Sequence, residues 1–155
     1  TNATVENTPG NASSGLVYDE GYYAPTVTNG GTLALSATDS QYFRYSRVGN
    51  QVTVYGHISV TEVGTGGTDV FFNLPFEVSG AIGSSTIAAI GSCMSHYISF
   101  LGGTLVPKAV NGTSTMVLMK MESGNTGTWD ALTGADYTLY AQIHFTLTYL
   151  CSGAE

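Results

Sequence analysis

Residues 41 to 61, QYFRYSRVGNQVTVYGHISVT, decide the fold class of this chain. From Val52 to Thr61, small or aliphatic residues alternate with polar or aromatic ones, which is typical of a strand with one buried and one exposed face. The Gly49-Asn50 pair before this run can adopt the positive φ angles of a two-residue hairpin turn. The stretch therefore predicts an antiparallel hairpin, whose second strand buries Val52, Val54, Gly56, Ile58 and Val60.

The same alternation returns near the end of the chain, between Asp136 and Leu150. We expect this segment to be a long strand in the centre of a sheet. One of its faces carries Tyr137, Leu139, Ala141, Ile143, Phe145, Leu147 and Tyr149.

Glycine-containing pairs and short apolar runs divide the rest of the chain. Gly102-Gly103 and Asn111-Gly112 predict further hairpin turns, and shorter strands are expected at 22–28, 69–74 and 86–94. No window of roughly eleven residues shows convincing helical spacing. Residues 21 to 155 are therefore predicted to form one all-β domain of about eight or nine strands, a jelly-roll-like antiparallel β-sandwich.

The first twenty residues have a different composition, rich in Asn, Thr, Ser and Gly, with little hydrophobic periodicity. This composition predicts an extended N-terminal arm over residues 1 to 20. Such an arm needs an outside surface to hold it in place. Its expected contact residues are Val5, Leu16, Val17 and Tyr18.

The charge balance excludes one large class of partners. Four Lys and Arg residues stand against eleven Asp and Glu residues, for a net charge of −7, which repels phosphate backbones. We therefore expect no binding to nucleic acid. The chain also lacks the roughly 18 consecutive apolar residues that span a bilayer, so no membrane association is expected.

The two cysteines, Cys93 and Cys151, could form one disulfide. A secreted domain that depends on disulfides usually contains more cysteines, and no Cys-x-x-Cys motif indicates a metal site. Two buried, reduced thiols are the favoured interpretation.

The sequence offers no pattern typical of an enzyme. There is no Gly-x-Ser-x-Gly turn for a nucleophile and no glycine-rich loop followed by lysine for a phosphate. Glycan hydrolysis needs two facing carboxyl groups, and the closest candidates, Asp130 and Asp136, are interpreted as solvated loop residues. We expect no enzymatic activity and no cofactor.

Four segments carry a resemblance to a known group of proteins: GYYAPTVTNGG (21–31), YFRYSRVGNQVTVYGHISV (42–60), FFNLPF (71–76) and GADYTLYAQIHFTLTYL (134–150). They resemble small bacteriophage virion proteins and tail-fibre terminal domains. The resemblance implies a compact β-sandwich, commonly a trimer, displayed on the virion surface after assembly in the host cytoplasm. Its motif is structural and consists of Tyr45, Arg47, Gly49, Asn50, Val52, Val54 and Gly56, followed by Leu74 and Pro75.

Apolar residues on both faces of several segments favour an oligomer. Residues 116–121 (MVLMKM), 70–76 (VFFNLPF) and 86–90 (TIAAI) are examples. A single sandwich buries only one face of each sheet, so the second apolar face indicates a partner. The threefold symmetry of that oligomer comes from the resemblance alone.

Polar and aromatic residues opposite the core are candidates for the contact between subunits. Several of the ten tyrosines, namely Tyr42, Tyr45, Tyr55, Tyr97 and Tyr140, are expected on such faces. The histidines at 57 and 144 fall on the polar faces of the two strongest strands, where a metal or pH-sensitive ring is the less favoured alternative to polar contacts. The predicted trimer interface therefore comprises Tyr55, His57, Tyr140 and His144.

Three roles remain open at this point. The first is a capsid decoration or cement protein, a homotrimer whose N-terminal arms tie together subunits of the major capsid protein. The second is the receptor-binding terminal domain of a tail fibre, which grips a host-surface glycan. The third is a free carbohydrate-binding module, which is disfavoured because the chain contains a solitary tryptophan, Trp129.

Overall fold

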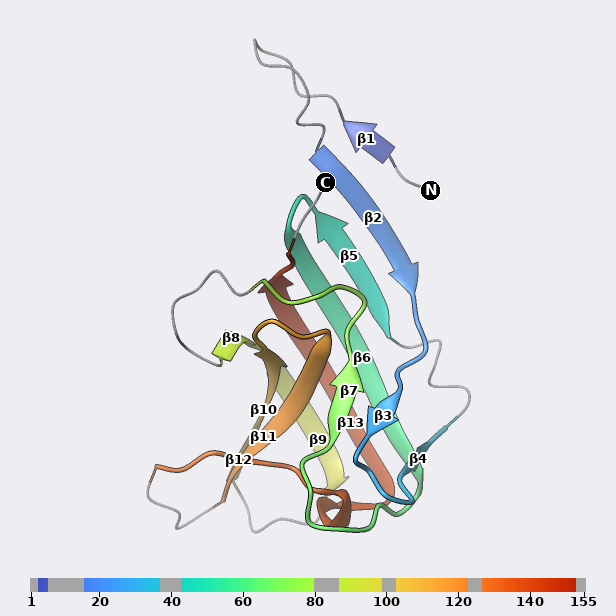
Figure 1. The fold of residues 1–155 in the computed structure, drawn as a ribbon. Coiled ribbons are helices and arrows are strands. Elements are labelled where there is room, and N and C mark those ends of the chain that lie inside the picture. Colours follow the sequence, from blue (N-terminus) through green and yellow to red (C-terminus); the bar gives the residue numbers. More distant parts are fainter. Residues whose placement is uncertain are drawn as a thin grey trace.

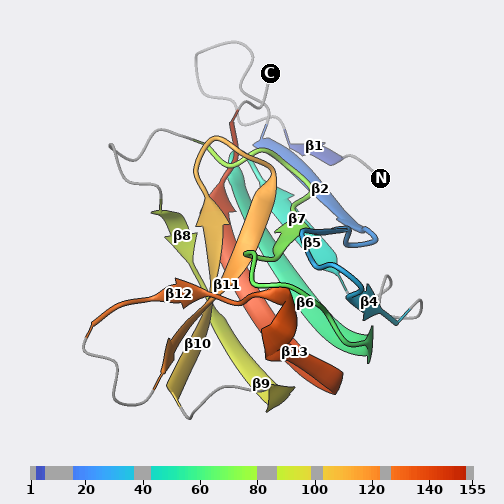
Figure 2. The same ribbon diagram turned by 60° about the horizontal axis from the view of Figure 1, so that its bottom comes forward.

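The computed structural model of the chain describes residues 3–5, 16–36, 43–79, 87–98, 103–122 and 127–152. Over these residues the protein is all-β, with two antiparallel sheets and one short 3-10 helix, η2 (Gly134–Asp136) (Figure 1 and Figure 2). The first sheet has the strand order β1 (Ala3–Val5), β2 (Leu16–Tyr22), β5 (Arg44–Val48), β6 (Gln51–Glu62), β13 (Tyr137–Leu150) and β9 (Ser92–Ile98), with β4 (Ala34–Leu35) paired to β6. The second has the order β3 (Val27–Thr28), β7 (Phe71–Asn73), β11 (Thr115–Glu122), β10 (Gly103–Val110) and β8 (Ile87–Ile90), with β12 (Asp130–Ala131) paired to β11.

One hydrophobic core lies between the two sheets, as in a β-sandwich. Val54, Ile58 and Ile143 enter it from the first sheet, and Phe72 and Leu118 enter it from the second. All five side chains are buried, and burial of each contributes roughly 1.5 to 3 kcal/mol. The predicted all-β class and the two packed antiparallel sheets are therefore confirmed.

The two strongest strand predictions are confirmed. β5 and β6 form the expected hairpin, with Val48 opposite Gln51 and with Gly49 at a φ of 59° in the turn. β13 lies between β6 and β9 in the first sheet. Because it is paired on both sides, the long final strand is central, as its alternation predicts.

The expected hairpin at Gly102-Gly103 is wrong. β9 belongs to the first sheet and β10 to the second, so the chain changes sheets between them. Gly103 is the first residue of β10, and a Cβ atom there would lie 1.9 Å from the carbonyl oxygen of Met121. This glycine therefore permits a close approach of two backbones and does not make a turn. By contrast, the hairpin at Asn111-Gly112 is confirmed by the pairing of β10 with β11.

The boundary expected between arm and domain, at residue 20, falls inside a strand. β2 pairs with β5 from Tyr18 to Tyr22, so this part of the expected arm belongs to the first sheet. β1 pairs in turn with β2, with Val5 opposite Leu16. The remaining residues of the expected arm, 1–2 and 6–15, lie outside the described residues.

An irregularity in β13 moves one expected core residue to the surface. The register with β9 shifts between Tyr137 and Gln142, and Tyr140 has a φ of 67°. The alternation of faces is lost across this bulge. Leu139, expected in the core, is 43% exposed as a result.

Candidate functional site

Among the described residues, the outer face of the first sheet carries no Asp, Glu, Lys or Arg side chain over the three adjacent strands β6, β13 and β9; on the next strand, β5, Arg44 stands opposite Tyr55 on the same face. We call this surface the uncharged face. The inward positions of β6 and β13 are buried in the core, so the alternate positions point away from it. The uncharged face consists of Gln51, Thr53, Tyr55, His57, Ser59, Thr61, Ser92, Met94, His96, Gln142, His144, Thr146, Thr148 and Leu150.

Two histidines mark the middle of this face. The register of β6 with β13 places His57 opposite His144, and their rings stack with centroids 4.2 Å apart and an angle of 7° between the planes. Across β13, His144 stands opposite Met94 of β9. A hollow of about 470 Å³ lies beside the stacked rings and is lined in part by Tyr55. These side chains form one partly apolar surface without Asp, Glu, Lys or Arg.

Gly56, which lies between Tyr55 and His57, makes room for a side chain on the core side of β6. Gly56 is buried and stands opposite Phe145, and a Cβ atom at position 56 would lie 2.0 Å from the Phe145 ring. The same ring packs edge-on against Phe43, with centroids 5.2 Å apart. Gly56 therefore allows an aromatic side chain to cover the strand from the core side.

The structure brings three of the four expected interface residues together. Tyr55, His57 and His144 lie around one hollow. Tyr140 does not line this hollow; it lies in the part of β13 where the register with β9 shifts. Tyr55, Tyr97 and Tyr140 are exposed, as expected. Tyr42 lies outside the described residues, and the expectation for Tyr45 is wrong.

Tyr45 points to the core side because it stands opposite buried Val54. Its ring packs edge-on against Phe76, with centroids 5.2 Å apart, and its hydroxyl donates a hydrogen bond to Asp19 at 3.2 Å. Burial is the main factor that raises the pKa of Tyr45, and Asp19 adds to it. This tyrosine therefore stabilises the domain and is not available to a partner.

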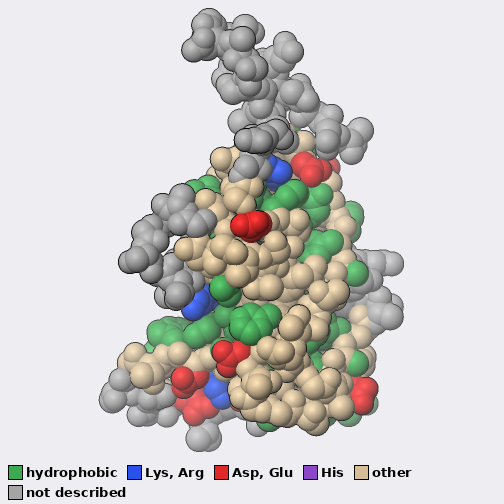
Figure 3. Space-filling view, viewed as in Figure 1, with side chains coloured by type: hydrophobic (Ala, Val, Ile, Leu, Met, Phe, Trp, Pro, Cys, Tyr) green, Lys and Arg blue, Asp and Glu red, His purple; other side chains and the backbone are tan. Residues whose placement is uncertain are grey.

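A second surface feature, a groove of about 570 Å³, lies on the outer side of the second sheet. Phe71 on β7 stands opposite Val117 on β11, which in turn stands opposite Lys108 on β10. Trp129 and Asp130 border the groove from the β12 side. Figure 3 shows hydrophobic side chains gathered on this face of the molecule, with acidic and basic side chains beside them.

The two carboxylates considered as a catalytic pair lie in different environments. Asp130 is exposed, whereas Asp136 is 9% exposed and accepts a hydrogen bond from Lys120 at 2.6 Å. Burial would raise the pKa of Asp136, but the hydrogen bonds from Lys120 and Thr133 outweigh burial and lower it. The interpretation of Asp136 as a solvated loop residue is therefore wrong, because it holds the start of η2 in place.

Both cysteines are free thiols, as the favoured interpretation predicts, and neither forms a reactive site. Cys151 is buried and Cys93 is half-buried, with its thiol donating to the carbonyl of Leu105 at 3.0 Å. Burial raises the pKa of the Cys93 thiol to about 11. Cys93 is therefore a poor nucleophile at neutral pH.

The described residues contain neither a metal-binding cluster nor a membrane-spanning helix. In this part of the chain, no cluster of three His, Cys, Asp or Glu side chains could hold a metal ion. Nor does the described chain contain a helix with the length and apolar character needed to cross a membrane.

No protein-family model, curated protein or solved structure matches this chain. The residues of the two surfaces and their geometry are therefore the basis for assigning a role.

The sequence did not predict the groove on the second sheet. Phe71, Lys108 and Trp129 come from segments far apart in the chain, and only the strand order β7–β11–β10 brings them together. The apolar run 116–121 does contain one signal for the groove, because it has apolar residues on both faces. From the sequence, the second of these faces is interpreted as a contact with another subunit. Val117, on that second face, is 3% exposed and lines the groove.

Proposed function

We propose that this protein is a non-enzymatic structural protein of the bacteriophage virion surface, and that it assembles as a homotrimer through the uncharged face. The observation that carries the proposal is the lack of Asp, Glu, Lys and Arg at the outward positions of the three adjacent described strands β6, β13 and β9; Glu62, the last residue of β6, falls on the alternate positions. Interface cores are depleted in charge and enriched in tyrosine and methionine, which matches Tyr55 and Met94 on this face.

Exposure and shape support the same role for this face. Met94 is 70% exposed, Tyr55 is 51% exposed and Leu150 is 45% exposed, so each has apolar area that association would remove from water. Burial of that area contributes roughly 25 cal/mol per Å² before the entropic cost of association. A second copy of the chain fits this surface because neither copy would have to bury an unpaired charge.

The number of subunits and the position on the particle rest on the resemblance. As a capsid decoration protein, the homotrimer stabilises the head through the N-terminal segments, which contact the major capsid protein. β1 supports this role because it is the edge strand of the first sheet, and edge strands can pair with a neighbouring chain. The contact residues proposed for this segment are Val5, Leu16, Val17 and Tyr18.

The test is to add the purified protein to particles that lack it and to locate its density by cryo-electron microscopy. We expect threefold density on the capsid lattice, with residues 1–15 lying over the capsid subunits. A variant that lacks residues 1–15 should keep the mass of the oligomer and bind the particle more weakly, because it loses Val5 and the edge strand β1. Equal binding by the truncated variant would contradict the role of the N-terminal segment.

The second candidate function is the receptor-binding terminal domain of a tail fibre. The groove on the second sheet favours it, because this groove lies on the opposite side of the domain from the uncharged face. A trimer formed through the uncharged face would leave the groove open to a receptor. Density at the end of a fibre, and none on the head, would select this candidate over the first.

A further inference from the structure

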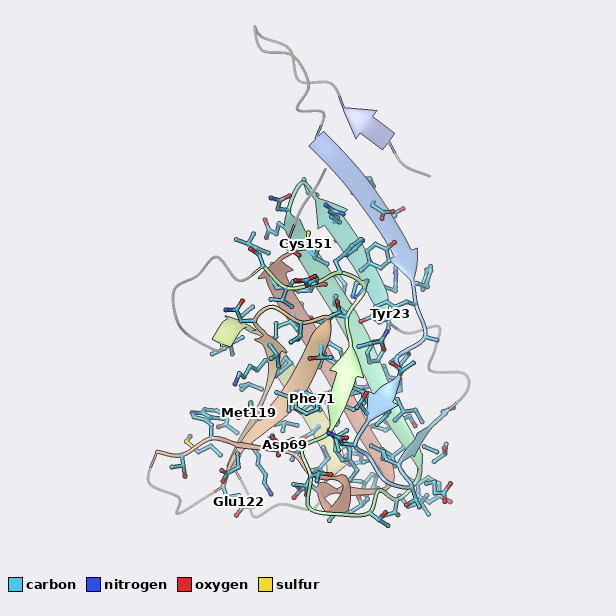
Figure 4. All side chains as sticks on the ribbon, in the orientation of Figure 1. Tyr23, Asp69, Phe71, Met119, Glu122 and Cys151 are labelled. Atoms are coloured by element: carbon cyan, nitrogen blue, oxygen red, sulfur yellow. The ribbon has the colours of Figure 1, made fainter. Side chains whose placement is uncertain are left out.

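The groove on the second sheet combines an apolar floor with a polar rim. The floor is formed by Phe71, Val117 and Met119, two of which are labelled in Figure 4. The indole of Trp129 is 41% exposed at the groove, so one large aromatic ring is open to a ligand. The rim contains the charged residues Asp69, Asp130 and Lys108 and the hydroxyl of Thr133.

The charged residues of the rim are not used by the fold. Within the described residues, no ion pair or hydrogen bond involves the side chains of Asp69, Asp130 or Lys108, whereas Lys120 and Asp136 pair with each other nearby. Two hydrogen-bond acceptors and one donor are thus available around the apolar floor. A groove of about 570 Å³ lies within the size range of small-molecule sites.

These features define the chemistry of the ligand that fits. An apolar ring face must lie against Trp129 or Phe71, and hydroxyl groups at the ring edge must donate to the two carboxylates. Lys108 disfavours a cationic ligand, and the excess of carboxylates disfavours an anionic one. A pyranose ring has one C–H face and a circle of hydroxyl groups, without net charge.

We propose that this groove binds a neutral oligosaccharide, with one sugar ring stacked on Trp129 and its hydroxyl groups donating hydrogen bonds to Asp69 and Asp130. Lys108 donates to ring or hydroxyl oxygens on the other side, where the hydroxyl of Thr133, which donates to Asp136, can accept a hydrogen bond. The groove and the uncharged face lie on different sheets, so binding does not depend on assembly. The inference therefore holds for either position of the protein on the particle.

The experiment begins with the full-length protein on a glycan array that contains neutral, sialylated and sulfated oligosaccharides. The best neutral oligosaccharide is then titrated in solution, with tryptophan fluorescence as the signal. Trp129 is the single tryptophan of the chain, so a change in its emission reports directly on the groove. We expect saturable binding of a neutral oligosaccharide with a shift in that emission.

Two variants test the proposed contacts. Asp130→Asn should weaken binding by about tenfold, the effect of one lost charge-assisted hydrogen bond. Trp129→Ala, measured by calorimetry, should weaken it by at least as much. Tyr55→Ala, on the opposite sheet, is the matched control and should leave the affinity of each groove unchanged.

Several outcomes would overturn the inference. These are no binding to any glycan, binding only to sialylated or sulfated glycans, and binding that Trp129→Ala leaves unchanged. Preferential binding of a lysine-rich peptide would also overturn it, since the carboxylates would then serve a cationic partner. All of these results are independent of the oligomer mass, so failure here is distinct from failure of the proposed assembly.

Discussion

The imidazole rings of His57 and His144 stack face to face at 4.2 Å, from neighbouring strands of the first sheet. They lie at the centre of a surface that has no charged side chain over β6, β13 and β9 in the described residues. This surface distinguishes the two sides of the domain, because the groove of the other sheet is bordered by three charged residues. We propose a different kind of contact for each side.

A charge placed on the uncharged face should break the assembly. Tyr55→Glu would put a carboxylate at a contact between copies, opposite Arg44 of β5, and removing the charged groups from water costs several kcal/mol. We expect the dissociation constant of the oligomer to rise about a hundredfold or more, measured by analytical ultracentrifugation. Ile90→Glu, at a position 60% exposed on the second sheet, is the control and should leave the constant unchanged.

Gly56 should not tolerate a side chain. Gly56→Ala forces the methyl group against the Phe145 ring, and we expect the free energy of unfolding to fall by about 2 kcal/mol, measured by urea denaturation. Gly67→Ala is the control, since a Cβ atom there meets nothing within 4 Å. If the clash is the cause, adding Phe145→Leu to Gly56→Ala should cost less than the sum of the two single changes.

Two buried tyrosines should respond oppositely to loss of the hydroxyl group. Among the described residues the hydroxyl of Tyr137 has no hydrogen-bond partner, so Tyr137→Phe should raise the free energy of unfolding by about 1 kcal/mol. The Tyr149 hydroxyl donates to the carbonyl of Phe76 at 3.1 Å, so Tyr149→Phe should lower it by about 1 kcal/mol. Equal effects in chemical denaturation would contradict these environments.

Asp136 should make stability depend on acid pH. Its pKa in the folded protein is lowered below the ordinary value of about 3.9, so its ionised form favours the folded state above that pH. The contribution is lost as the pH falls through the folded pKa. The difference in free energy of unfolding between the wild type and Asp136→Asn should therefore be constant above about pH 5 and shrink below about pH 4. A difference that stays constant to pH 2 would contradict the Lys120 contact.

Cys93 should react slowly as long as the protein is folded. Burial raises the pKa of its thiol to about 11, so the reactive thiolate is a minor species at pH 8. A disulfide reagent such as Ellman's reagent should modify it slowly in the native state and rapidly in denaturant. Rapid reaction in the native state would show that the thiol is more exposed than described.

The sequence predicts this fold best where the pattern within a single strand is sufficient to identify it. Alternation alone was sufficient for the β5–β6 hairpin and for β13, because each buries one face against the other sheet. Composition places the segment LVYDEGY in an arm, because Asp19 and Glu20 put a charge on each face of the strand and the surrounding Asn, Ser and Gly obscure its pairing with β5.

A glycine between two apolar segments does not by itself predict a turn, because glycine also allows two backbones to approach closely. Gly49 and Gly103 look alike in sequence, yet one makes a tight turn and the other lets two strands approach closely. Interface candidates followed from strand periodicity, which places Tyr55, His57 and His144 on one face. The groove could not be predicted, because it requires the strand order of the second sheet.

The most direct test of the central claim is the mass of the purified protein by sedimentation equilibrium, for the wild type and Tyr55→Glu side by side. We expect three times the chain mass for the wild type and a single chain mass for the variant at the same concentration. A wild type that sediments as a single chain at every concentration, or a Tyr55→Glu variant that keeps the mass of the wild type, would contradict assembly through the uncharged face.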